Sequence, residues 1–153
     1  MKHLARLVLS LAVALLLHGT TVLAEQTPDP ELREVLRAAA NDSASFVDRF
    51  DAEVWLTDMS RRLERHIEDP GERIQLLTQV HLEASRAELP PELVLAVIEV
   101  ESNFDRYAVS VAGALGLMQI MPFWLDEIGR PNDNLLHVDT NLRYGCTILR
   151  FYL

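Results

Sequence analysis

The chain has 153 residues, a formal net charge of −9, 49% hydrophobic residues and a single cysteine. The length suggests one domain, and the composition is that of a packed globular protein. The excess of acidic side chains argues against nucleic acid and anionic lipid surfaces as partners, because binding to phosphates depends on basic side chains.

The first 24 residues are typical of a secretory signal peptide. Lys2 and Arg6 precede an apolar run at residues 7–17, and small residues end at Ala24. Eleven residues are too few to span a bilayer comfortably, so we expect cleavage after Ala24 and export to the periplasm or another compartment outside the cytoplasm. An uncleaved membrane anchor is the alternative. Cleavage would remove two basic and no acidic side chains, leaving a formal charge of −11 and no stable membrane insertion.

The remainder of the chain predicts helices and no convincing strand. Asp69 followed by Pro70 and Glu72 forms a capping box that marks one helix start, and Pro91 suits the first turn of the next helix. Apolar periodicity and cap signals place helices at about 31–40, 44–67, 70–87, 91–102, 117–129 and 140–152, with Asp139 as the cap of the last. The sequence therefore predicts an all-α domain of short, differently angled helices.

Glu101 is the most unusual acidic residue in this pattern. At ~100° per residue, Val94, Val97 and Ile98 lie on the same side of the helix as Glu101, whereas Glu99 lies near the opposite side. We therefore expect Glu99 to be solvated and Glu101 to lie on the buried face. Apolar surroundings disfavour a charged carboxylate, and a carboxyl group that keeps its proton near neutral pH can act as a general acid. The alternative is a partly exposed glutamate without a role.

A glycine-containing stretch follows this helix. Gly113 and Gly116 allow turns and a close approach of the backbone to a ligand. The next residues are Leu117, Met118, Gln119 and Ile120. Gln119 is suited to hydrogen-bond a hydroxyl or acetamido group, and Met118 and Ile120 are suited to line a groove against sugar faces. The alternative is that the glycines only form a loop and the apolar side chains only fill the core.

The remaining candidate groups predict little chemistry. Cys146 cannot form an intrachain disulfide, and we expect it to be buried and inert. His66, His81 and His137 each have an acidic residue two positions on, a spacing that does not bring side chains together on a helix. No metal and no other cofactor are expected.

Several of these motifs together resemble the soluble lytic transglycosylases of bacterial cell walls. The resemblance rests on Glu101-Ser102 at a helix end, on the run Ala-Val-Ser-x-Ala-Gly-Ala-x-Gly-Leu-Met-Gln-Ile-Met-Pro at 108–122, and on residues 139–145. It covers residues 89–153, so residues 25–88 are expected to form an N-terminal helical extension. The resemblance implies a goose-lysozyme-like helical fold and peptidoglycan glycan strands as the partner, and it identifies no protein partner.

The resemblance also implies roles for individual residues. Glu101 would be the catalytic acid/base that cleaves the β-1,4 bond between N-acetylmuramic acid and N-acetylglucosamine, with a 1,6-anhydro product, and Ser102 would help to hold its carboxylate. The substrate-binding set would be Ser102, Gly116, Leu117, Met118, Gln119 and Ile120. A second acid near Glu101 would favour hydrolysis instead, but we expect Asp105, the nearest in sequence, to be solvated or to cap the loop.

One departure from the family pattern concerns an Ala-Tyr-Asn motif whose tyrosine lies beside the catalytic glutamate in that family. The sequence ends at Leu153, before this motif, which suggests a fragment or a truncated product with a C-terminally incomplete domain. We therefore expect weak or no catalysis by these 153 residues alone and exposed apolar surface around Leu149 and Leu153. The alternatives to a transglycosylase are a hydrolase of the same bond, resembling goose-type lysozyme, and a catalytically silent peptidoglycan-binding protein.

Overall fold

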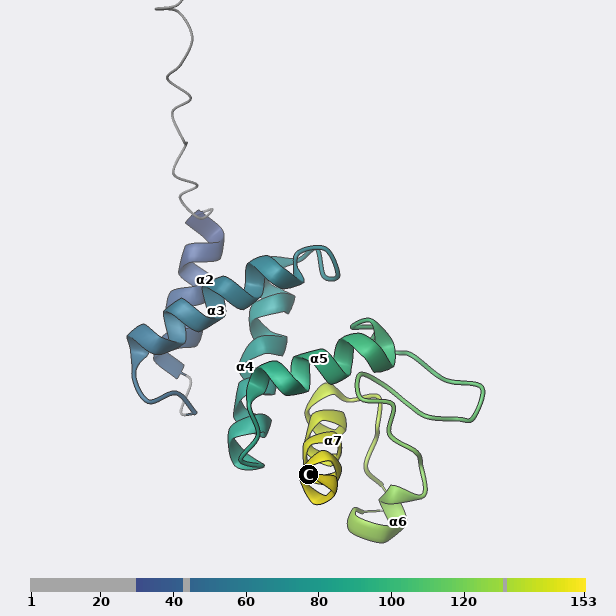
Figure 1. Ribbon diagram of the computed structural model, residues 1–153. Coiled ribbons are helices and arrows are strands. Elements are labelled where there is room, and N and C mark those ends of the chain that lie inside the picture. The colour runs from purple at the N-terminus through teal and green to yellow at the C-terminus, as the bar shows by residue number, and fades with distance from the viewer. Residues whose placement is uncertain (1–29, 43–44, 131) are drawn as a thin grey trace, which may run out of the picture.

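The computed structural model describes residues 30–42, 45–130 and 132–153, and the predicted signal peptide at 1–24 lies outside this part. The described residues form helices α2 (Pro30–Asp42), α3 (Arg49–Leu63), α4 (Pro70–Arg86), α5 (Pro91–Ser102), α6 (Trp124–Ile128) and α7 (Val138–Tyr152) (Figure 1). Extended pairing within them is limited to isolated bridges, so the predicted all-α class is confirmed. Among these helices none is both long enough and apolar enough to cross a membrane.

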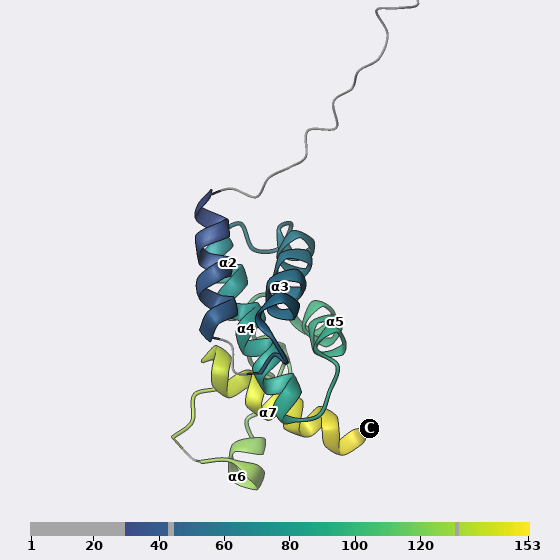
Figure 2. The same ribbon diagram turned by 90° about the vertical axis from the view of Figure 1, so that its left-hand side faces the viewer.

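Helix α4 is the centre of the molecule, since it packs against α2, α3, α5 and α7 (Figures 1 and 2). Asp69 caps α4 by accepting a hydrogen bond from the backbone N–H of Glu72 at 2.6 Å, as the capping box predicts. The residues of α4 that are fully buried include Leu77, Val80 and Ala84. One continuous core joins them to residues on both sides of position 88, so the N-terminal helices and the rest of the chain share their apolar interior.

Helix α3 starts later than predicted. Asp48 is its N-cap and accepts hydrogen bonds from the backbone N–H groups of Phe50 and Asp51 at 2.7 and 2.9 Å, so the helix begins at Arg49 rather than at residue 44. The periodicity of residues 44–67 predicts an apolar face on which Leu56, Met59 and Leu63 are buried, as expected. Phe50 and Val54, which it places on the same face, are 77% and 71% exposed. The buried face consists of Ala52, Leu56, Met59, Ser60 and Leu63.

The predicted helix at 117–129 is wrong except for α6. The chain before α6 forms a compact loop in which Leu115 makes isolated bridges with Val109 and Ile120. Gln119 has a φ of 48°, which is incompatible with a right-handed helix. The cap of α7 is also misplaced in the prediction, because His137 occupies the N-cap position and Asp139 lies in the first turn.

Asn141 ties this loop to α7. Its side chain is 1% exposed, its Oδ1 accepts a hydrogen bond from the backbone N–H of Met118 at 2.8 Å, and its Nδ2 donates to the carbonyl oxygens of Leu115 and Leu135, each at 2.8 Å. The close fit requires glycine at 116, where φ is 74° and a Cβ atom would collide with Nδ2 of Asn141. The position of the loop is therefore fixed from α7.

The exposure of the C-terminal apolar residues follows the prediction in part. Leu153 is 74% exposed, whereas Leu149 is half-buried and packs against the core.

Cys146 is completely buried, as predicted. Burial raises the pKa of its thiol to about 12; the negative charge of Glu83 adds to this rise and Arg86 partly opposes it. The thiolate, which is the reactive form, is therefore scarce in the folded protein.

Replacement of Asn141 by leucine tests how the loop is held. Asn141→Leu keeps the approximate shape but leaves the buried N–H group of Met118 and the buried carbonyl group of Leu135 without partners. We therefore expect the free energy of unfolding to fall by about 2 kcal/mol or more in urea titrations. The exposed Asn132 supplies the control, and Asn132→Leu should change stability by less than about 0.5 kcal/mol. Equal losses in the two variants would show that the buried amide does not hold the loop.

Alkylation of Cys146 tests its burial. At about pH 8, well below the pKa of about 12, we expect iodoacetamide to modify the folded protein far more slowly than the protein unfolded in urea, as followed by intact mass. Equal rates in the folded and unfolded protein would contradict the buried position.

Candidate active site

Glu101 lies in the last turn of α5, and its side chain is exposed. Among the residues that the structure describes, no hydrogen bond or ion pair involves its carboxylate. The expectation of burial is therefore wrong. The N-terminal part of α5 lies against α4, whereas its C-terminal end reaches past α4 (Figure 1). A helical wheel gives the direction of a side chain but not the element opposite it, so Val94 and Ile98 are buried while Glu101 faces solvent.

The chain leaves α5 through a strained turn. Asn103 is the C-cap with φ of 51°, and Phe104 follows with φ of 67°. Two successive left-handed residues other than glycine are energetically costly, and such strain is concentrated at functional sites. The buried Phe104 ring packs against His66, with ring centroids 4.8 Å apart, and this contact anchors the turn. Glu101 thus lies immediately before a rigidly held turn.

The acidic neighbours of Glu101 are engaged elsewhere. Glu99 is a surface residue whose Oε1 lies 2.6 Å from Nη2 of Arg65 and 3.5 Å from Nε2 of His66. Asp105 accepts a hydrogen bond from the backbone N–H of Tyr107 at 2.8 Å, which confirms the expected exposed, loop-capping role. Of the three carboxylates at Glu99, Glu101 and Asp105, only that of Glu101 has no hydrogen-bond or ion-pair partner among the described residues.

Ser102 does not hold the carboxylate of Glu101 in this structure. Its hydroxyl donates to the carbonyl oxygen of Ile98 at 3.1 Å, one turn earlier in α5. This local bond accounts for the half-buried serine at a helix end.

The apolar members of the predicted substrate-binding set belong to the core. Leu117, Met118 and Ile120 are 1%, 6% and 5% exposed. Gly145 on α7 provides space for Met118, because a Cβ atom at position 145 would collide with the Met118 sulfur. The structure therefore agrees with core filling for these three side chains, and a contact between them and a glycan stays a prediction.

Gly116 and Gln119 shape the loop itself. Gly116 is buried at the turn, and the Nε2 of the half-buried Gln119 donates to the carbonyl oxygens of Ala108 and Gly116 at 3.2 and 2.9 Å. These two bonds use both N–H donors of the Gln119 amide within the loop. Its carbonyl oxygen is the group left for a ligand.

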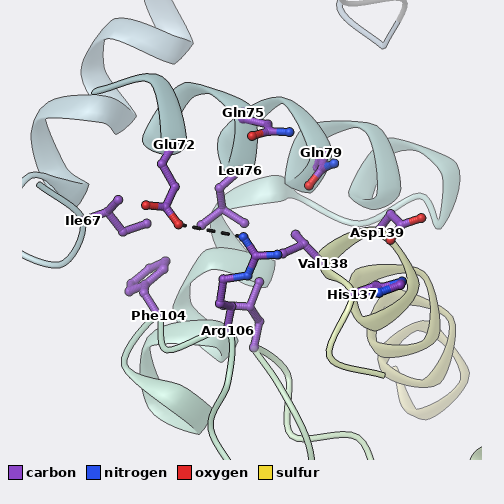
Figure 3. A pocket seen from close by; sticks show the side chains of 11 residues that line it. Ile67, Glu72, Gln75, Leu76, Gln79, Phe104, Arg106, His137, Val138 and Asp139 are labelled. Carbon is purple, nitrogen blue, oxygen red and sulfur yellow. Dashed lines mark ion pairs between the residues drawn. The ribbon is translucent and has the colours of Figure 1, made fainter. Parts of the chain in front are cut away.

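Two features of this region were not found from the sequence. Asn141 fixes the loop, and the sequence did not predict this role. Its position within the stretch 139–145, which resembles the family pattern, was the one sequence feature that pointed to it. Phe104 and Arg106, three and five residues after Glu101, line a pocket of about 210 Å³ between α4 and the start of α7 (Figure 3). The sequence motifs contribute only Leu117 and Asp139 to this pocket, and its walls come from four separate segments.

Comparison with known proteins finds sequence similarity over the part of the chain that contains these residues. Residues 80–153 match the family model described as transglycosylase SLT domain. The match contains Glu101, the loop and Asn141. No solved structure matches the chain.

Several curated relatives share this region. A segment of 48 residues is 50% identical to membrane-bound lytic murein transglycosylase C of Actinobacillus pleuropneumoniae and covers 31% of this chain and 13% of that protein. A segment of 109 residues is 32% identical to the protein of the same name from Haemophilus ducreyi and covers 65% of this chain and 29% of that protein. The chain therefore spans less than a third of either relative. Residues 80–153 of this chain therefore resemble the transglycosylase SLT domain family, and the order of the motifs agrees with this match.

Proposed function

We propose that the protein is a peptidoglycan lytic transglycosylase that cleaves the β-1,4 bond between N-acetylmuramic acid and N-acetylglucosamine. The observation that carries this proposal is the family match over residues 80–153, which includes Glu101 and the loop at 108–122. Proteins similar to parts of this chain are named membrane-bound lytic murein transglycosylase C. Action on peptidoglycan requires export, in line with the signal-like residues 1–24.

Glu101 is proposed as the single acid/base of the reaction. Its protonated carboxyl would donate the proton to the glycosidic oxygen as the bond to the muramic acid C1 breaks. The resulting carboxylate would then accept the proton of the C6 hydroxyl of the same sugar, whose oxygen closes the 1,6-anhydro ring on C1. Both reacting groups belong to one sugar, so intramolecular proximity replaces the second carboxylate of an ordinary glycosidase.

The exposure of Glu101 adds a requirement to this mechanism. A solvated carboxylate is stabilised in its charged form, and a general acid must hold its proton until the glycosidic bond breaks. The protein core does not cover Glu101. The bound glycan is therefore proposed to displace water from the end of α5 and to supply the apolar surroundings.

The same exposure favours a second candidate function. A protein that binds peptidoglycan without cleaving it would not need a shielded carboxylate, and the exposed Glu101 without partners fits this role. The two candidates differ in whether the side chain of Glu101 is needed for release of soluble fragments.

Glu101→Gln separates the two candidates. We expect the purified protein to release soluble muropeptides from cell-wall sacculi, at a low rate, and Glu101→Gln to reduce release by about a hundredfold or more while co-sedimentation with sacculi is unchanged. Glu99→Gln is the matched control on the same helix, and its loss of a surface ion pair should leave release nearly unchanged. Binding without release in the wild-type protein would support the silent candidate, and equal release by Glu101→Gln would exclude Glu101 as the acid.

The product identifies the reaction. Ring closure within one sugar adds no water, so we expect the muropeptides to be lighter by one water than those from a hydrolase of the same bond. Mass spectrometry of the soluble products, with a hydrolytic muramidase digest as the reference, checks this difference. Products of hydrolytic mass would contradict the transglycosylase and support a lysozyme-like hydrolase.

A further inference from the structure

We propose that the pocket between α4, the turn after α5 and the start of α7 binds a small zwitterionic group, namely the ammonium and carboxylate of an amino acid or a short peptide. Figure 3 shows the Arg106 guanidinium reaching into this pocket between Glu72 and Val138. Glu101 does not line this pocket, which shares only Leu117 with the predicted substrate-binding set, and the inference does not depend on the proposed function.

Arg106 is the first reason to expect a ligand. Its Nη1 lies 4.0 Å from Oε1 of Glu72, which is too long for a hydrogen bond. Its Nε is buried and has no hydrogen-bond partner. Among the described residues, it is the one buried side-chain nitrogen or oxygen atom without a partner. A guanidinium presents five N–H donors, and buried donors without a partner are rare in folded proteins. The side chain is thus placed to donate to a group that enters the pocket.

The geometry of the guanidinium selects a carboxylate. Its planar fork pairs with the two oxygens of a carboxylate through parallel hydrogen bonds. Helix α7 starts at the same pocket with no side-chain cap, so its positive end adds to the attraction of an anion. The part of the pocket next to Arg106 and the start of α7 is therefore suited to bind one negatively charged group.

The other charged groups of the pocket select an ammonium on the same ligand. Glu72 and Asp139 both line the pocket, so a ligand with only negative charge would be repelled by two carboxylates. A ligand whose ammonium faces Glu72 while its carboxylate faces Arg106 would complement both. Gln75 and Gln79, one turn apart on α4, supply neutral amides that can hydrogen-bond a peptide group between the two charges (Figure 3).

The size and apolar walls of the pocket limit the ligand. The volume of about 210 Å³ is below the range usual for drug-sized ligands. The apolar part of the lining includes Phe104, Leu76 and Val138, which suits a small side chain such as that of alanine. A short peptide with free ends therefore fits better than a sugar polymer.

Four forms of one dipeptide test the charge requirement on the full chain. Alanyl-alanine with free ends is compared with its N-acetylated form, its C-terminal amide and the doubly blocked form, and binding is followed by NMR through the Nε–H resonance of Arg106. We expect the free dipeptide to bind and each singly blocked form to bind about fivefold more weakly or worse, since each loses one charge-assisted contact.

Two pairs of variants assign the contacts. Arg106→Met, followed by backbone amide shifts of the pocket residues, should weaken binding of the free dipeptide about tenfold or more, and Arg61→Met on the exposed surface of α3 is its control. Glu72→Gln should weaken binding of the free dipeptide but not of the N-acetylated form, with Glu68→Gln as its control. Near-identical spectra of the unliganded variants would show that each remains folded.

Three results would overturn the proposal. The first is the absence of any shift with all four dipeptides at millimolar concentration. The second is equal binding of the free and N-acetylated forms, which would remove the role of the ammonium. The third is tighter binding of inorganic phosphate than of the free dipeptide, which would identify a simple anion site.

Discussion

The buried amide of Asn141 is the constraint on which the site region depends. It satisfies the backbone N–H group of Met118 and the carbonyl group of Leu135, which would otherwise be buried without partners, and it adds a second hydrogen bond to the carbonyl group of Leu115, all from helix α7. Glycine at 116 allows the amide to approach, and glycine at 145 allows Met118 to pack against α7. The loop at 108–122 therefore has one position relative to α7, and the Gln119 amide closes it from within.

Helix α4 links this loop to the N-terminal helices. Its apolar face joins α2 and α3 to α5 and α7 in one core, and its outer face forms a wall of the pocket that contains Arg106. The C-terminal end of α5 is held in the core by Ile98 and Phe104, whereas Glu101 between them faces solvent. The packing that stabilises the domain thus leaves the proposed catalytic carboxylate open to a large polymeric substrate.

The sequence predicted the features that depend on local chemistry. The capping box at Asp69 fixed the start of α4, and the single cysteine was expected to be buried. The loop at 117–122 was predicted as helix because its residues are compatible with a helix. No feature of Leu117, Met118 or Ile120 indicates that Gln119 between them has a left-handed backbone conformation. Glu101 was expected to be buried because periodicity gives only a direction around the helix. Asn141 and the Arg106 pocket depend on contacts between distant segments, and no local pattern contains that information.

The proposed mechanism requires that a bound glycan, rather than the protein core, shields the Glu101 carboxylate from water. The most direct test is the solvent accessibility of the Glu101 carboxyl, measured by NMR on protein with carbon-13-labelled glutamate in the presence of a soluble paramagnetic agent. Addition of a soluble peptidoglycan glycan fragment should reduce the paramagnetic broadening of the Glu101 resonance and leave that of the exposed Glu34 on α2 unchanged. If the fragment binds and the broadening at Glu101 stays the same, the glycan does not cover the carboxylate and the account is wrong.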